Sequence, residues 1–183
     1  MRMCRPPSPA PHQRFPLSSN VHPLERHAVP LHRKKKRHVY KPTTHHKLMT
    51  RGQRNHNPLN IRLSKGTRWL GQCTRQYDRE FVQFQSDLFG FRAAFRIMRT
   101  YIRLHHLHTL RLIIYRWAPP EDGNNTETYL ATVSERSRVP AGKQLTFEDE
   151  DELIEIVAAM ALVESRMADI DRELLRKAYR LAM

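Results

Sequence analysis

Apolar residues recur every three or four positions along the second half of the chain, which is the period of a helix with one buried face. The pattern predicts a helix from Ser86 or Asp87 to about His105, and a second from Thr109 to the prolines at 119 and 120. Three more are predicted over about 125–136, 146–165 and 169–182. We therefore expect about five helices, with 146–165 central because apolar residues cover most of its surface.

Ahead of these helices the pattern changes to short alternating runs that are separated by turn residues. Asn57 and Pro58 signal a turn, and residues 60–63, 68–72 and 81–84 each have the character of a short extended piece. These runs predict a small antiparallel β-region. Residues 49–183 are thus expected to form a single α+β domain that is mainly helical.

Residues 1–48 show neither the helical period nor the alternation of a strand. They hold eight of the twelve prolines, seven of the eleven histidines, no glycine and the basic run RKKKR at 33–37. Such a composition cannot bury enough apolar surface to offset the entropy of ordering, so a disordered basic tail is predicted. A solvated tail, a phosphate-binding arm and a targeting signal are its alternative roles, and Met49 is a candidate for the true start of the protein.

The formal charge of +14 is unevenly spread along the chain. Residues 1–50 hold eleven Lys and Arg against one acid, residues 51–118 hold thirteen against three, and residues 119–183 hold eight against fourteen. Most of the positive charge therefore belongs to the tail, and the predicted domain has a basic first half and an acidic second half.

The sequence lacks the residues that several classes of function require. Two cysteines cannot supply a disulfide framework or a four-ligand zinc site, and six glycines leave no phosphate-cradling loop. The histidines at 105, 106 and 108 have no cysteine or carboxylate at ligand spacing. We expect no metal and no cofactor, and the sequence shows neither a membrane-spanning run nor the apolar core of a cleaved signal peptide.

A narrow cationic stripe lies along the first predicted long helix. At about 100° per residue its four arginines fall within roughly 60° of one another. The stripe consists of Arg92, Arg96, Arg99 and Arg103. It predicts either a polyanion-binding surface, with Arg111 and Arg116 nearby, or a solvated face that pairs with the acidic start of the helix at 146–165.

Glu164 is the candidate catalytic residue if the substrate is a glycan, because glycoside cleavage needs a protonated acid beside the scissile oxygen. It follows an apolar run and ends the predicted central helix, where partial burial and the negative helix terminus both favour the protonated form. The alternative is a glutamate that marks the point where the helix emerges into solvent. Glu80 and Asp87 are second candidates.

Aromatic side chains offer a platform for a carbohydrate or, alternatively, part of the core. These are Trp69, Trp117, Tyr101 and Tyr129.

A set of spaced motifs resembles a family of small bacteriophage and prophage virion structural proteins of gut Bacteroidetes type. The motifs are RGQRNHNPLNIR from 51, Trp69 with Gly71, FVQF at 81–84, GFRAAF at 90–95, RTYIR at 99–103 and RWAPPEDGNNTETYLATVSE at 116–135. The resemblance covers about 49–183. Some relatives are similar to lysozyme-like modules that act on peptidoglycan, with a small β-region, a helical lobe and a glutamate that ends a helix.

The resemblance implies a virion-associated protein that binds or cleaves bacterial peptidoglycan as a glycoside hydrolase or lytic transglycosylase. Glu164 would be the general acid, with Asn57, Asn60, Tyr129 and Trp117 binding the substrate. Relatives tend to have Asn-Gly or Ser-Gly after this glutamate, whereas this chain has Ser165 and Arg166. The expected partners are the cell wall or other virion proteins, and the expected location is the virion, or the bacterial cytoplasm during expression. The alternative is a non-catalytic virion or nucleic-acid-contacting protein that uses the stripe and the tail.

Overall fold

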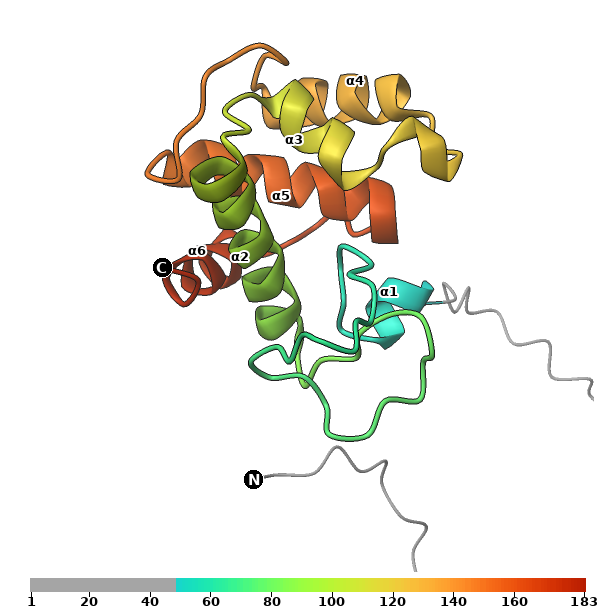
Figure 1. Cartoon of the computed structure of the whole chain (residues 1–183). Coiled ribbons are helices and arrows are strands. Elements are labelled where there is room, and N and C mark those ends of the chain that lie inside the picture. Colours follow the sequence, from blue (N-terminus) through green and yellow to red (C-terminus); the bar gives the residue numbers. More distant parts are fainter. Residues whose placement is uncertain (1–48) are drawn as a thin grey trace, which may run out of the picture. The chain divides into compact units, whose positions relative to one another are not determined.

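A computed structural model describes residues 49–183, so the predictions for the tail, the RKKKR run and the Met49 start lie outside the described residues. Within this range the structure is mainly helical (Figure 1). The elements are α1 (Arg51–Arg54), α2 (Asp87–His105), α3 (Leu110–Trp117), the 3₁₀ turn η1 (Pro120–Asp122), α4 (Thr126–Ser137), α5 (Glu150–Ser165) and α6 (Arg172–Arg180). The predicted mainly helical class is confirmed.

The predicted helix starts coincide with observed caps at two points. The Thr109 hydroxyl accepts a hydrogen bond from the Leu112 amide, and the Asn125 side chain accepts one from the Thr128 amide. Both cap amides that would otherwise have no partner at a helix start. The helix predicted from 146 begins at Glu150 instead, because the Asp149 carboxylate turns back to accept from the Thr146 amide and holds 146–149 as a turn.

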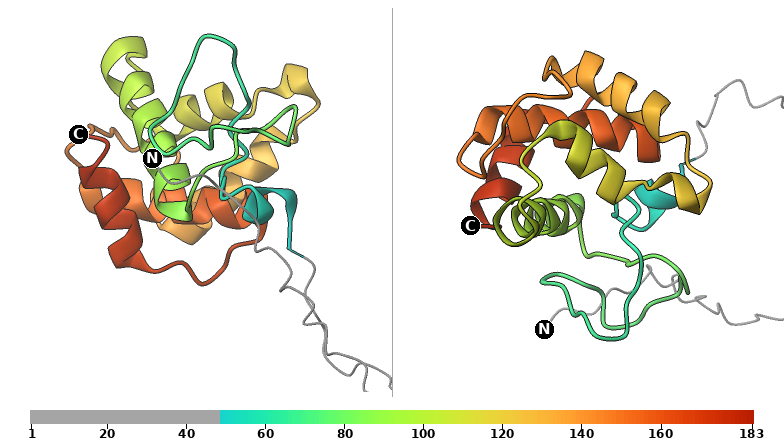
Figure 2. Two further views of the ribbon diagram at one scale, coloured as in Figure 1. Left: turned by 90° about the horizontal axis from the view of Figure 1, so that it is seen from below. Right: turned by 45° about the horizontal axis from the view of Figure 1, so that its top comes forward.

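The helix α5 lies at the centre of the described structure. Figures 1 and 2 show α3 and α4 on one side of it, with α2 and α6 packed together beside it. Nearly every residue from Leu153 to Ala161 is buried. Three buried rings, Phe95, Phe147 and Tyr179, connect α2 and α6 to the segment that leads into α5, with Tyr179 edge-on to Phe95 and stacked on Phe147. The predicted central position of 146–165 is therefore confirmed.

The predicted antiparallel β-region is wrong as a sheet. Residues 55–86 contain two isolated antiparallel bridges, Arg62 with Phe81 and Gln72 with Phe84, and no strand. The extended geometry is interrupted at Asn60 and Gly71, which have φ values of 48° and 73°. A continuous ladder requires negative φ at each residue, so these two positions limit the pairing to single bridges.

Side-chain amides replace the missing ladder. The Asn57 amide nitrogen donates to the carbonyls of Ile61 and Val82, each at 2.9 Å, and its oxygen accepts from the Ile61 amide at 2.8 Å. Asn57 is fully buried, so these bonds satisfy a polar group that would otherwise be costly to bury. They hold the segment around Asn60 in one conformation without a sheet.

The helix α1 joins this segment to the end of α5. The Thr50 hydroxyl and the Gln53 amide nitrogen both donate to the Ser165 carbonyl, at 3.2 and 3.0 Å. The last carbonyls of a helix have no partner within the helix, so these donors act as its C-terminal cap. The contact places the 55–63 segment beside the last turn of α5, where Glu164 lies.

Candidate functional site

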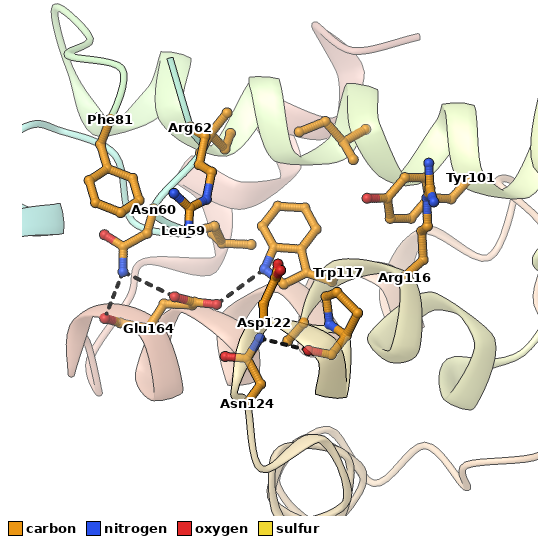
Figure 3. Close-up of a pocket in the computed structure, with 14 residues that line it drawn as sticks. Leu59, Asn60, Arg62, Phe81, Tyr101, Arg116, Trp117, Asp122, Asn124 and Glu164 are labelled. Carbon is orange, nitrogen blue, oxygen red and sulfur yellow. Dashed lines mark hydrogen bonds between the residues drawn. The ribbon is translucent and has the colours of Figure 1, made fainter. Parts of the chain in front are cut away.

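A cavity of about 390 Å³ opens beside the last turn of α5. Figure 3 shows that its walls come from the 59–62 segment, from α2 and from the α3–η1 junction. It is lined by Leu59, Asn60, Ile61, Arg62, Phe81, Ile97, Tyr101, Arg116, Trp117, Ala118, Pro119, Asp122, Asn124 and Glu164. Polar and aromatic side chains thus meet around one carboxylate at the end of the central helix.

The Glu164 carboxylate accepts three hydrogen bonds from side chains on three other parts of the chain. Asn60 Nδ2 donates to Oε2 at 3.0 Å, while Trp117 Nε1 and the Tyr129 hydroxyl each donate to Oε1 at 3.1 Å. Asn60 Nδ2 also donates to the backbone carbonyl of Glu164 at 3.1 Å. The side chain is partly buried, and these bonds fix its direction toward the cavity (Figure 3).

Tyr129 lies in the core beneath Glu164 and is only 9% exposed. Burial holds the pKa of its hydroxyl well above its usual value, and the neighbouring Glu164 carboxylate raises it further. The phenol therefore stays protonated at neutral pH and remains a hydrogen-bond donor to Oε1.

The other predicted substrate-binding residues occupy different positions. Asn60 and Trp117 line the cavity, whereas Asn57 is fully buried and its side chain bonds to the backbone of Ile61 and Val82. Glu80 forms a salt bridge with Arg51, and the Asp87 carboxylate lies 2.8 Å from His56 Nδ1. Neither of these acids lines the cavity, so Glu164 is the predicted candidate that reaches it.

The sequence did not indicate several residues that line the cavity. Arg62 lies in an irregular segment and Asp122 ends η1, while the sequence placed Arg116 only near the cationic stripe. The closeness of Arg62 to Asn60 in the sequence is the one local signal that relates a member of this group to the predicted site. The others are brought there by tertiary packing of α3 against α2.

The four arginines of the stripe make mostly structural contacts. Arg92 Nε donates to the Leu181 carbonyl at 3.0 Å, and Arg96 Nη1 donates to the Ala182 carbonyl at 3.2 Å. Arg103 pairs with Glu148, and the Arg99 guanidinium lies 6.0 Å from the centre of the Phe147 ring. Burial lowers the pKa of Arg92, and the charge of Arg96 adds to this effect.

The acidic start of α5 pairs mainly with cations outside the stripe. Its partners are Arg172 for Glu155, Arg176 for Asp151, Arg180 for Glu150 and Lys143 for Glu152. Within residues 49–183 there is no group of three or more His, Cys, Asp or Glu side chains suited to a metal ion, and no helix long and apolar enough to cross a membrane.

The fold and cavity define a mainly helical protein whose central helix ends in a carboxylate at an open site. No protein-family model matches the chain. The chain is 39% identical over 100 residues to Protein P5 of Pseudoalteromonas phage PM2, and the match covers 54% of this chain and 62% of the relative. The predicted relation to bacteriophage proteins is therefore confirmed, over somewhat less than two thirds of the relative's length.

Proposed function

We propose that the chain is a virion-associated structural protein of phage origin that binds or cleaves bacterial peptidoglycan through a lysozyme-like site. The relation to a phage protein supports the virion location and other virion proteins as partners. The gut Bacteroidetes-type source stays a prediction. The observation that carries the enzymatic part is the Glu164 carboxylate, which three side-chain donors hold at a cavity of about 390 Å³.

In this proposal Glu164 acts as the general acid of glycoside cleavage. Protonated Glu164 would give its proton to the glycosidic oxygen, the bond from that oxygen to the anomeric carbon would break, and the leaving sugar would depart as an alcohol. The resulting carboxylate would then take a proton from the hydroxyl that attacks the anomeric carbon. Water as that hydroxyl makes the protein a hydrolase, and a hydroxyl of the same sugar makes it a lytic transglycosylase.

The hydrogen bonds distinguish the two oxygens of Glu164. Oε1 accepts from both Trp117 and Tyr129, whereas Oε2 accepts from Asn60 alone. Oε2 therefore has more unused capacity for a proton, and it is the oxygen that we assign to proton transfer. The Trp117 ring beside the carboxylate supplies an apolar face on which a sugar ring can lie.

The relation between Asn60 and Glu164 supports the lysozyme-like part of the proposal. In an ordinary lysozyme the helix that carries the glutamate precedes the β-region, whereas here Glu164 comes 104 positions after Asn60. The hydrogen bonds between them bring the early Asn-rich turn to the end of the late helix. A permuted order, with the irregular 55–86 segment in the place of the β-region, would produce this arrangement.

A zymogram on purified peptidoglycan tests the enzymatic form of the proposal. The wild-type chain should clear the substrate and Glu164→Gln should not, because the amide keeps the shape of the side chain but cannot transfer the proton. Glu135→Gln, on an exposed face of α4, is the matched control and should clear like wild type. Clearing by neither chain, or equal clearing by wild type and Glu164→Gln, would remove the enzymatic proposal.

The rival proposal is a non-catalytic protein that contacts nucleic acid through the stripe. The contacts of Arg92, Arg96 and Arg103 with carbonyls and Glu148 offer it less support, because each of these side chains already uses a guanidinium donor within the fold. DNA affinity that falls steeply with salt, and less steeply once Arg96 and Arg99 are changed to Gln, would favour the rival.

A further inference from the structure

Two arginines that line the cavity have no acid within salt-bridge distance in residues 49–183. Neither Arg62 nor Arg116 forms a salt bridge there, although both line the cavity. Arg51, whose guanidinium like that of Arg62 contacts the Phe81 ring, is held by Asp78 and Glu80 at 2.7 Å. The difference leaves Arg62 and Arg116 as cations that are available to a ligand.

Arg116 lies beside Tyr101 at one end of the cavity (Figure 3). It stands next to Trp117 in the last turn of α3, and Tyr101 belongs to α2. Burial raises the pKa of Tyr101, and the charge of Arg116 opposes that rise. The phenol is therefore neutral at neutral pH and does not cancel the charge of Arg116.

The labelled side chains of the cavity follow an order that suits an extended ligand. In Figure 3 the Trp117 ring stands between the Glu164 carboxylate and the pair formed by Tyr101 and Arg116. A glycan that lies on the indole with its scissile oxygen at Glu164 would direct a neighbouring substituent toward Arg116. Asp122 lies nearer the middle of the cavity in the same view, away from the Tyr101 end.

We propose that Arg116 forms a subsite for a carboxylate carried by the glycan substrate, so that the site selects acidic over neutral sugar chains. This inference rests on the function proposed above. Two carboxylates of peptidoglycan fit it: the lactyl carboxylate on alternate sugars, which is free once the peptides are removed, and the carboxylates of the peptides themselves. The planar guanidinium fork matches either one through two parallel hydrogen bonds.

Binding to the inactive full-length chain tests the subsite without cleavage of the probe. Three probes would be titrated into Glu164→Gln by calorimetry: peptide-free glycan tetrasaccharides, the same tetrasaccharides with their carboxylates reduced to alcohols, and tetrasaccharides that retain their peptides. The peptide-free acidic probe should bind about tenfold more tightly than the reduced probe, as expected for one charge-assisted pair. The third probe shows whether peptide carboxylates serve equally well.

Variants identify Arg116 as the source of this preference. Adding Arg116→Gln to Glu164→Gln should abolish the tenfold difference, and Arg116→Lys should keep part of it because the charge remains without the fork. Adding Arg136→Gln, which removes an exposed charge of α4 outside the cavity, should leave the difference intact. Thermal unfolding of each variant verifies that it is folded.

The outcomes separate this inference from the proposed function. Equal affinity for the acidic and reduced probes in Glu164→Gln, or a preference that survives Arg116→Gln, overturns the carboxylate subsite and leaves glycan binding in place. Binding of none of the three probes overturns both proposals. A preference that disappears only with Arg116→Gln supports the subsite, and the affinity for the acidic probe should then weaken with added salt.

Discussion

Asn60 and Glu164 are joined by two hydrogen bonds from a single amide nitrogen, at 3.0 Å to the carboxylate and at 3.1 Å to the backbone carbonyl. The Asn60 side chain thereby fixes the position of the Glu164 carboxylate at the cavity. Asn60 also has a φ of 48°, a left-handed conformation that asparagine and glycine tolerate better than other residues.

Replacing Asn60 separates its side-chain role from its backbone role. Asn60→Gly should slow clearing of a peptidoglycan suspension by about 10- to 100-fold, because a hydrogen bond to a charged group is worth about 1.5–3 kcal/mol. Asn60→Ala should lose activity equally and also lose about 1 kcal/mol of unfolding free energy relative to Gly, since Ala is strained at this φ. Wild-type clearing rates in Asn60→Gly would show that the pair does not position Glu164.

Gly52 allows α1 to lie directly against the end of α5. A Cβ at this position would stand 2.0 Å from Ser165 Oγ and 2.9 Å from the Asn57 carbonyl oxygen. Gly52→Ala should therefore lower the free energy of unfolding by about 1–3 kcal/mol, measured by urea denaturation. Gly142→Ala is the control, because a Cβ there meets no atom within 4 Å.

Removing the Ser165 hydroxyl should relieve part of this clash. Ser165 Oγ is buried and has no hydrogen-bond partner among the described residues, so Ser165→Ala alone should cost little. The double variant Gly52→Ala with Ser165→Ala should be more stable than Gly52→Ala. Strict additivity of the two changes would contradict the assigned contact.

Arg166 ends α5 with a left-handed φ of 54°. Glycine carries no penalty in this conformation. Arg166→Gly should raise the free energy of unfolding by about 0.5–1 kcal/mol. Arg138→Gly, at the equivalent position of α4, should act in the same direction, whereas Arg136→Gly within α4 should destabilise. A loss of stability in Arg166→Gly would mean that the arginine side chain makes a stabilising contact.

The Asp78 carboxylate connects the irregular segment 55–86 to Arg51 in α1. The hydrogen-bonded Arg51 guanidinium holds the pKa of Asp78 far below its ordinary value of 3.8, with further donors at Glu80 and Asn55. Because the folded pKa is lowered, the stabilisation is present above pH 4 and is lost as the pH falls toward the folded value. Asp78→Asn should lower stability at pH 7 and flatten the loss of stability below pH 4, measured by thermal unfolding across pH. An unchanged acid profile in Asp78→Asn would contradict this.

The helices could be predicted because their signals are local. Thr109 and Asn125 cap the amides three residues ahead of them, and the prolines at 119 and 120 follow the end of α3. Each of these boundaries is therefore determined by a few neighbouring residues. The β-region could not be predicted correctly. Apolar and polar residues do alternate there, but whether the extended pieces pair as strands depends on the bonds of Asn57 and on the left-handed Asn60. Neither effect is visible in a hydrophobic pattern.

The candidate site was predictable in part for the same reason. Glu164 is marked by its place after an apolar run, and Asn60 by the turn in which it lies. The roles of Arg62, Arg116 and Asp122 depend on how α3, η1 and the 59–62 segment pack around α5, which joins residues up to 104 positions apart. Periodicity carries no information about such contacts.

The most direct test of the account is mass spectrometry of the sugars released from purified peptidoglycan by the wild-type chain and by Glu164→Gln. We expect wild type to release glycan fragments whose ends either contain or lack one added water, according to whether water or a sugar hydroxyl attacks. Glu164→Gln, with an unchanged unfolding transition, should release none. Release of the same fragments at the same rate by Glu164→Gln, or no release by wild type, would contradict the assignment of Glu164 as the general acid.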